Sequence, residues 1–433
     1  MALEEAGVPT VAVHTHVFNR LAKSVAKAGG MPHMPQAFVP QPVVGQAPER
    51  LRAYIEGTDP VSKRPFLQEL IEGLTTAATQ NGGVSFDRSI PRMLEPDTEE
   101  NLQRLFIANQ WSDYLPIVLP TEERVAAMLE GTSHAPDEVV GRLRPTAFRE
   151  WWEFTVEKVA VNAVMAGARP EYLPVILAMA STGVTARSSS TTSFATVALV
   201  NGPIREEIGM NTGIGAMGPY AHANATIGRA YSLLSQNLQG GSVPGETYMG
   251  SQGNFLNYNA TFAESEEASP WEPFHVSHGH RTDESVVSCF LGGWYTIFGG
   301  GPRHTWQEKF QRSLQACDPF TGPIVCLDPL VARGFVELGF DTKDKLAEHL
   351  SQLSTLPARE YWDNQWVQTL YKPFAVAGVE PHASRYAVAP EEDVQMFSPD
   401  QIHIVVTGGE TGAMWKMVGG MLRDGIASVD AWR

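Results

Sequence analysis

The chain has few cysteines, few charged residues and no long apolar run, and each shortage excludes a class of protein. The three cysteines, Cys289, Cys317 and Cys326, are too few for a disulfide framework and form no Cys-x-x-Cys pair. No apolar stretch reaches the roughly 18 residues of a membrane-spanning helix, and the acidic start Leu-Glu-Glu-Ala-Gly is unlike a signal peptide. We therefore expect a cytoplasmic protein without a membrane partner and assign no catalytic role to the cysteines.

Basic residues are also scarce relative to acidic ones. The chain contains 32 lysines and arginines and 48 aspartates and glutamates, which gives a net charge of −16. This charge repels phosphate and argues against nucleic acid as a partner. With 433 residues, 43% of them apolar and 18% charged, the chain can form two or three domains with a large core or an intersubunit surface.

The segment from Asn201 to Arg229 combines many glycines with amide and guanidinium side chains. Glycines at this density weaken a chain unless another group must approach the backbone closely, and the varied residue order argues against low complexity. The apolar run before the segment predicts a buried strand, and ligands of α/β sheets bind beyond the carboxyl ends of strands. We therefore expect a small polar substrate to be bound by Asn201, Arg205, Asn211, Asn224 and Arg229.

Residues 213–218 of this segment match the Gly-x-Gly-x-x-Gly pattern. A dinucleotide site requires a strand directly before these glycines and an acidic residue about 20 positions later. Here a charged turn separates strand and glycines, and residues 232–245 contain no aspartate or glutamate. We therefore favour a glycine turn that directs backbone amides toward a polar group, and no cofactor is evident.

Carboxylates and histidines are concentrated in residues 263–285. A carboxylate can orient an imidazole that titrates near neutrality, as proton transfer requires. His275, which has apolar neighbours, is the best candidate for a buried base, and Glu267 and Glu272 are the accompanying acids. A divalent metal on the His-x2-His-x-His sequence is one alternative, although the spacing matches no zinc motif. A solvated acidic loop is another.

Two further places could contribute to the same pocket. A second buried strand in residues 401–407 is followed by Gly408 and Gly409, which could form a second wall of the site or an ordinary turn. The repeated strand–glycine pattern suggests two similar α/β halves. Arg169 follows a strongly apolar helix predicted over residues 147–168, and it could face the pocket or pair with Glu171.

The first 80 residues predict a small α/β layer. A strand in residues 8–16, an amphipathic helix in residues 17–29 and a proline-interrupted strand in residues 36–45 precede a helical region. Two strands leave an unpaired edge and lack a core of their own. A partner chain or the remainder of this chain should therefore complete the layer.

The run ALEEAGVPTVAVHTHVFNRLAKSVAKAGGMPHMPQAFVPQPVVG resembles the segment that follows the redox motif in the UGSC-motif (seleno)protein family. Further runs, such as YLPIVLPTEERVAAML and NGPIREEIGMNTG, resemble the larger domain found with that family. The resemblance implies a motif of selenocysteine or cysteine followed by Gly-Ser-Cys, placed upstream of the first run. This chain contains no Cys-Gly-Ser-Cys sequence, which puts thiol or selenol chemistry within it in doubt.

We therefore predict an α/β fold in which an incomplete thioredoxin-like or flavodoxin-like layer precedes a larger α/β body. The expected divisions are residues 1–80 for that layer, 81–145 for a connecting region, 146–320 for the central domain and 321–433 for a C-terminal half.

Three functions are consistent with these features. The first is an enzyme, or the large subunit of one, that acts on a small polar molecule by acid–base chemistry of the lyase type. The second is the substrate-binding subunit of a reductase whose cysteine motif lies on a separate small chain. The third is a non-catalytic scaffold subunit. All three imply an oligomer.

Overall fold

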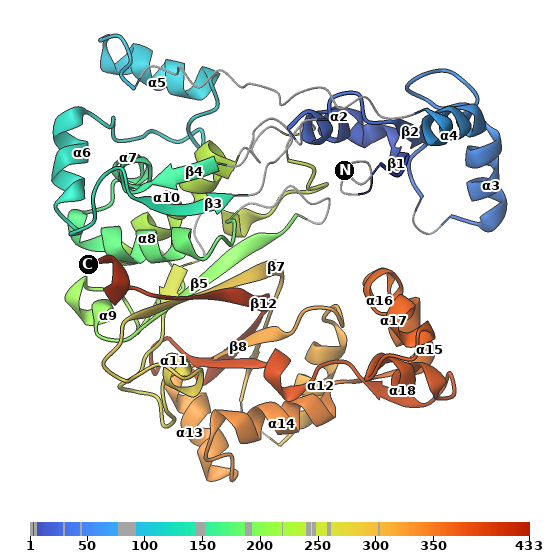
Figure 1. Ribbon diagram of the computed structural model, residues 1–433. Helices are drawn as coiled ribbons and strands as arrows, with labels where there is room; N and C mark the ends of the chain where they lie inside the picture. The colour runs from blue at the N-terminus through green and yellow to red at the C-terminus, as the bar shows by residue number, and fades with distance from the viewer. Residues whose placement is uncertain are drawn as a thin grey trace.

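The computed structural model of the protein describes residues 3, 7–28, 31–43, 46–76, 92–143, 152–186, 193–218, 220–239, 244, 248–257, 261–301 and 304–433. Its main body is a mixed six-stranded sheet with helices on both sides, so the fold is α/β as predicted (Figure 1). Across the sheet the strand order is β11-β8-β12-β7-β5-β6. The strands are β5 (Ala195–Asn201), β6 (Thr261–Ala263), β7 (Val286–Gly300), β8 (Pro323–Leu327), β11 (His403–Val406) and β12 (Met414–Ser428).

The six strands form two units of the same connectivity. In the first unit, β5 and β6 pair in parallel with α10 (His222–Gln239) between them in the chain, and β7 pairs antiparallel to β5. In the second unit, β8 and β11 pair in parallel, and β12 pairs antiparallel to β8. The long strands β7 and β12 join the units by antiparallel pairing. The body thus consists of two topologically related halves.

The two edge strands of this sheet, β6 and β11, meet at their carboxyl ends. The backbone N–H of Ser265 donates to the carbonyl of Val406 at 2.8 Å, and the Thr407 hydroxyl donates to the carbonyl of Ala263 at 2.9 Å. Because the edges meet, the inner face of the sheet encloses one apolar cluster drawn from both units. It contains Val197, Leu199, Phe262, Phe274, Phe290, Ile324, Cys326, Val405 and Val418.

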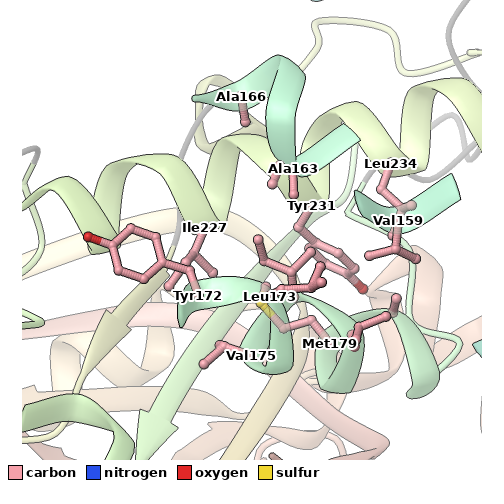
Figure 2. Close-up of a cluster of buried hydrophobic side chains, with 14 of the residues drawn as sticks. Val159, Ala163, Ala166, Tyr172, Leu173, Val175, Met179, Ile227, Tyr231 and Leu234 are labelled. Carbon is pink, nitrogen blue, oxygen red and sulfur yellow. The ribbon is translucent and has the colours of Figure 1, made fainter. Parts of the chain in front are cut away.

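Each unit is covered on its outer face by its own helices, which lie on opposite sides of the sheet in Figure 1. The first unit packs against α7 (Val156–Ala166), α8 (Leu173–Ser181) and α10. Figure 2 shows side chains of these three helices, such as Val159, Leu173 and Tyr231, packed together. The second unit packs against α12 (Trp306–Gln315), α13 (Pro329–Glu337) and α14 (Lys343–Leu353).

Capping residues set the ends of these helices. Side chains of Thr155, Asp328 and Thr342 accept hydrogen bonds from the first turns of α7, α13 and α14. Gly167 ends α7 with a φ of +80°, a conformation that glycine adopts without strain. The helix predicted over residues 147–168 therefore begins later, at Val156. Residues 152–155 instead form strand β4, which pairs with β3, and residues 147–151 lie outside the described chain.

The N-terminal layer has the predicted order of elements. Strands β1 (Ala12–Thr15) and β2 (Gln36–Val39) pair in parallel, and Ala37, Val39 and Phe66 form a small core. In the described part of the chain, β1 pairs with β2 alone. The helices of this layer are η1 (His16–Phe18), α2 (Asn19–Ala28), α3 (Pro48–Glu56) and α4 (Phe66–Thr75).

The remaining elements lie outside the six-stranded sheet and the six helices named above. A lobe inserted between α14 and β11 contains β9 (Thr355–Pro357), α15 (Ala358–Asp363), α16 (Gln365–Leu370), α17 (Lys372–Val376), α18 (His382–Ala387), β10 (Asp393–Gln395) and η4 (Pro399–Gln401). The other elements are α5 (Glu99–Ala108), α6 (Glu122–Leu129), β3 (Val139–Leu143), β4 (Trp152–Thr155), η2 (Pro170–Tyr172), α9 (Ile204–Glu207), η3 (Phe255–Asn257), α11 (Phe274–Ser277) and η5 (Asp430–Trp432). Over the ranges given above, no helix is both long enough and apolar enough to cross a bilayer.

Candidate functional site

Polar side chains gather where β5 and β6 end. Asn201 is the last residue of β5, and Glu264 directly follows β6. Because these strands are parallel neighbours, their carboxyl ends lie at the same edge of the sheet. The Asn201 amide donates to Glu264 Oε2 at 2.6 Å and to Glu266 Oε1 at 2.9 Å. The strand ends thus hold two carboxylates on one carboxamide.

Glu264 is fully buried and connects several elements. Its Oε2 accepts the backbone N–H of Phe274 at 2.7 Å, which fixes the start of α11. Its Oε1 lies 2.5 Å from the ammonium nitrogen of Lys343, the first residue of α14. Burying these two charges is tolerable because each neutralises the other and both are hydrogen-bonded. Glu264 therefore joins the first unit of the sheet to a helix of the second.

Arg205 organises the loop after β6. It lies in the short helix α9 with 3% of its surface exposed. Its guanidinium donates to the carbonyls of Gly202 and Glu264 and forms ion pairs with Glu266 at 3.0 Å and Glu267 at 2.8 Å. The hydrogen bond from Arg205 lowers the pKa of Glu267, whose side chain is 57% exposed.

His275 lies behind Glu266 in α11 and is fully buried. Its Nδ1 is 3.8 Å from Glu266 Oε1, which is too long for a hydrogen bond. Burial lowers the pKa of His275, and the nearby Glu266, Glu264 and Arg281 carbonyl oppose this shift only in part. The imidazole is therefore neutral at pH 7 and able to accept a proton.

Three buried polar atoms around Glu266 form no hydrogen bond of ordinary distance and angle with the described residues, the Arg281 carbonyl near His275 included. They are Asn201 Oδ1 and both ring nitrogens of His275. Buried polar groups are nearly always paired, so a group of unpaired ones requires a specific reason, such as catalysis or a bound polar molecule. The unpaired atoms lie on side chains that approach the same carboxylate oxygen. This cluster of Asn201, Arg205, Glu264, Glu266, Glu267 and His275 is called the carboxylate cluster below.

The two predicted glycine turns meet beside it. The backbone N–H of Gly408 donates to the carbonyl of Thr212 at 2.9 Å. Gly409 packs so closely on Ile214 that a Cβ at position 409 would lie 2.9 Å from the backbone nitrogen of Ile214. The absence of a side chain at Gly409 therefore allows the loops after β5 and β11 to touch.

Asn211, Asn224 and Arg229 are occupied in contacts with the protein itself. Asn224 is fully buried and exchanges hydrogen bonds with the backbone of Asn211, which holds the glycine loop against α10. Arg229 forms a two-pronged ion pair with Asp113, with both N–O distances at 3.0 Å. These contacts give the three residues structural roles in this conformation.

Arg169 and Glu272 lie outside the carboxylate cluster. The Arg169 side chain is 60% exposed and its nearest carboxylate, Glu171, is 3.9 Å away. Glu272 is exposed on the loop before α11. Exposure leaves both side chains largely hydrated, so neither is held in a fixed position beside His275.

The sequence pattern does not identify Glu264, Glu266 or Lys343 as site residues. It favours a solvated loop for Glu266, yet this side chain is only 10% exposed. The position of Glu264 directly after a short apolar run is a usable signal, because strand ends hold ligands. The local sequence contains no such signal for Lys343, since its contact with Glu264 spans 79 residues.

A divalent metal, the alternative for the His-x2-His-x-His sequence, requires His275, His278 and His280 to lie close together. Instead, His280 lies 3.1 Å from Glu284, and His278 Nδ1 lies 2.8 Å from the carbonyl of Phe274. In the part of the chain that the structure describes, no three histidine, cysteine, aspartate or glutamate side chains are grouped to hold a metal ion.

The three cysteines are free and buried. Burial raises the pKa of Cys289, Cys317 and Cys326 to about 12. A nucleophilic thiol requires a lowered pKa, so these residues behave as small core side chains.

Comparison with known proteins finds a family match for the N-terminal part of the chain. Residues 1–64 match the model of the UGSC family, in agreement with the resemblance of the first run. No curated protein and no solved structure matches the chain.

Proposed function

We propose that this chain, which begins with a UGSC-family segment, is an enzyme or the large subunit of one that acts on a small polar molecule by acid–base chemistry of the lyase type. The observation that carries the proposal is the group of unpaired buried atoms, Asn201 Oδ1 and the two His275 nitrogens, around the Glu266 carboxylate. Neutral imidazole beside a carboxylate is suited to proton transfer near pH 7.

Arg205 provides the place where a substrate carboxylate would bind. Its partner Glu267 is more than half exposed, and an ion pair at such a position contributes little to stability because solvent screens it. A substrate carboxylate can therefore replace Glu267 on Arg205 at small cost. It would form the two parallel hydrogen bonds that guanidinium groups favour.

The remaining residues have roles that follow from their positions. His275 removes a proton from the carbon next to the substrate carboxylate, and Glu266 stabilises the imidazolium that results. The electron pair left on that carbon forms a carbon–carbon double bond as a hydroxyl group on the next carbon departs. The departing oxygen takes the proton from the imidazolium, so water is released and His275 returns to its neutral form.

Solvent deuterium exchange tests the proposal across a whole class of candidate substrates. The purified full-length chain is incubated in D2O with a panel of short 3-hydroxy carboxylates, and proton NMR follows exchange at the carbon next to the carboxylate. We expect exchange with at least one compound, and loss of at least 100-fold in rate for His275→Asn and for Glu266→Gln, since general acid–base groups contribute roughly 10²–10⁴-fold.

His280→Asn is the matched control, because His280 lies in the same loop and pairs with Glu284 instead of the carboxylate cluster. It should retain exchange. Equal loss in the His275 and His280 variants, with both folded by circular dichroism, would contradict the assigned roles.

A second function, the substrate-binding subunit of a thiol- or selenol-dependent reductase, is favoured by one observation. Residues 1–64 match the UGSC family, while the cysteines of this chain are buried and have raised pKa values. The redox group would then lie on a separate small chain, which could complete the layer beside β1. Copurification of a short Cys-Gly-Ser-Cys protein with the native complex would support this function. Exchange activity that survives thiol alkylation of the complex would support the first.

A non-catalytic scaffold is the third candidate, supported if no panel compound exchanges and no redox chain copurifies. All three place the protein in an oligomer in the cytoplasm, where unpaired thiols such as Cys289 stay reduced.

A further inference from the structure

We propose that a niche between α11, α14, η4 and β11 binds a small organic ammonium ion. The niche has a volume of about 200 Å³ and opens to solvent. Its lining includes Phe274, His278, Lys343, Asp344, Asp400 and His403. Pockets for drug-sized ligands measure about 300–1,000 Å³, so this one suits a smaller molecule.

His403 is a buried polar side chain that lines the niche. Its side chain lines the niche from β11 with 8% of its surface exposed. The ring contacts Phe274, Phe290 and His278, and forms no hydrogen bond with the described residues. Burial, reinforced by His278, lowers the pKa of His403 to about 4. The imidazole is therefore neutral at pH 7 and offers a lone pair to a donor without repelling a cation.

The charges of the niche favour a cation. Asp344 and Asp400 are exposed carboxylates at its rim. The positive charge of Lys343 in the wall is neutralised by Glu264 at 2.5 Å. The two rim carboxylates are thus uncompensated within the niche and attract a positively charged group.

Apolar walls determine the rest of the ligand. Phe274, Ala347 and Ile402 surround the polar groups and are all buried. A short alkyl chain can cover these side chains while its ammonium group donates to His403 and faces the rim carboxylates. The chemistry of the niche therefore selects a primary alkylammonium ion over a neutral alcohol or a carboxylate of the same length.

The niche also adjoins the carboxylate cluster through one side chain. Lys343 lines the niche and pairs with Glu264, which accepts the Asn201 amide. A bound cation would weaken the ion pair between Lys343 and Glu264 and so alter the carboxylate cluster. The importance of this effect rests on the proposed function. Binding itself does not depend on that function.

The experiment compares three probes of equal length, n-butylammonium, n-butanol and n-butyrate, by saturation-transfer NMR and calorimetry with the full chain at pH 7 and low salt. We expect n-butylammonium to bind with a Kd of about 1 mM, with binding at least tenfold weaker for the alcohol and the carboxylate. The double variant Asp344→Asn/Asp400→Asn should weaken n-butylammonium binding at least fivefold.

The double variant Glu337→Gln/Glu392→Gln is the matched control, because it removes two exposed carboxylates that lie outside the niche. It should leave the Kd within twofold of the native value. A Kd for n-butyrate equal to or below that of n-butylammonium would overturn the proposal. So would equal effects of the two double variants, or binding of Zn²⁺ that involves His278 and His403 and excludes n-butylammonium. Since no readout is catalytic, failure here leaves the proposed function untouched, and failure of the exchange assay leaves this binding site untouched.

Discussion

Glu264 and Lys343 form a buried ion pair between the end of β6 and the start of α14, with 2.5 Å between carboxylate oxygen and ammonium nitrogen. This ion pair links the two halves of the body, because β6 belongs to the first unit and α14 covers the second. It also connects the carboxylate cluster, to which Glu264 belongs, with the niche around His403, which Lys343 lines.

Removal of one partner of this pair should be strongly destabilising. Lys343→Met leaves the Glu264 carboxylate buried without its cation, which costs about 3–5 kcal/mol in the free energy of unfolding. Urea denaturation measures the difference. Lys345→Met on the same helix is the control: its partner Asp341 is 62% exposed, so the cost should stay within about 1 kcal/mol. Equal losses in the two variants would refute the importance of the buried pair.

Mild acid should destabilise the protein through His403. Its pKa is about 4 in the folded protein and close to 6.5 when unfolded, so the unfolded state binds more protons between these values. The free energy of unfolding should therefore fall as pH drops from 6.5 toward 4, by up to about 3 kcal/mol from this residue. His403→Phe cannot titrate and fits among the aromatic rings of Phe274 and Phe290. Denaturation curves at pH 7 and 4.5 should show a smaller acid loss in this variant; an unchanged loss would argue against His403 as the cause.

The native thiols should not react with alkylating reagents. A pKa of about 12 leaves less than about one thiolate in 10⁴ at pH 8, and burial also blocks access to Cys289 and Cys326. Intact mass spectrometry after an hour in iodoacetamide should show no adduct, whereas protein in 6 M guanidinium should take up three. Rapid modification of Cys289 in the folded protein would revive thiol chemistry within this chain.

The contact between the glycine loops should be sensitive to a single methyl group. In Gly409→Ala the new Cβ approaches the backbone of Ile214 at 2.9 Å, and the overpacking should cost about 1–3 kcal/mol. Gly412→Ala, whose Cβ would meet only Met414 at 3.8 Å, is the control and should be close to neutral. Thermal unfolding of the two variants side by side measures the effect, and a destabilised Gly412 variant beside an unaffected Gly409 variant would reverse this interpretation.

Sequence patterns predict the short strands that are apolar throughout and miss the long strand β12, which contains glycine. Strands β5 and β11 are short, buried runs and lie where the patterns place them. No pattern predicts a strand over residues 414–428, which form β12. Gly420 lies there because a Cβ would meet Ile324 and Phe290 from the neighbouring strands. Such a close approach is a property of the assembled sheet and leaves no local periodicity.

The same limit applies to the site. The sequence selects Asn201 and Arg205 as candidates because they follow an apolar run in a glycine-rich segment, and His275 because its neighbours are apolar. The chemistry of Glu264 depends on Lys343, and that of Glu266 on Arg205, at separations of 79 and 61 residues along the chain. Arg229 is paired with Asp113, which lies 116 residues away and cannot be identified from local spacing, so its expected contact with a substrate stays a prediction.

The meeting of β6 and β11 has a consequence for how the body can be divided. The halves are also paired along β7 and β12, so a fragment cut between β7 and β8 would lose both contacts and expose the backbone groups of an unpaired strand to solvent. Such an edge recruits other chains and aggregates. The halves should therefore be recovered as soluble fragments only when they are coexpressed, so that each fragment can pair with the other.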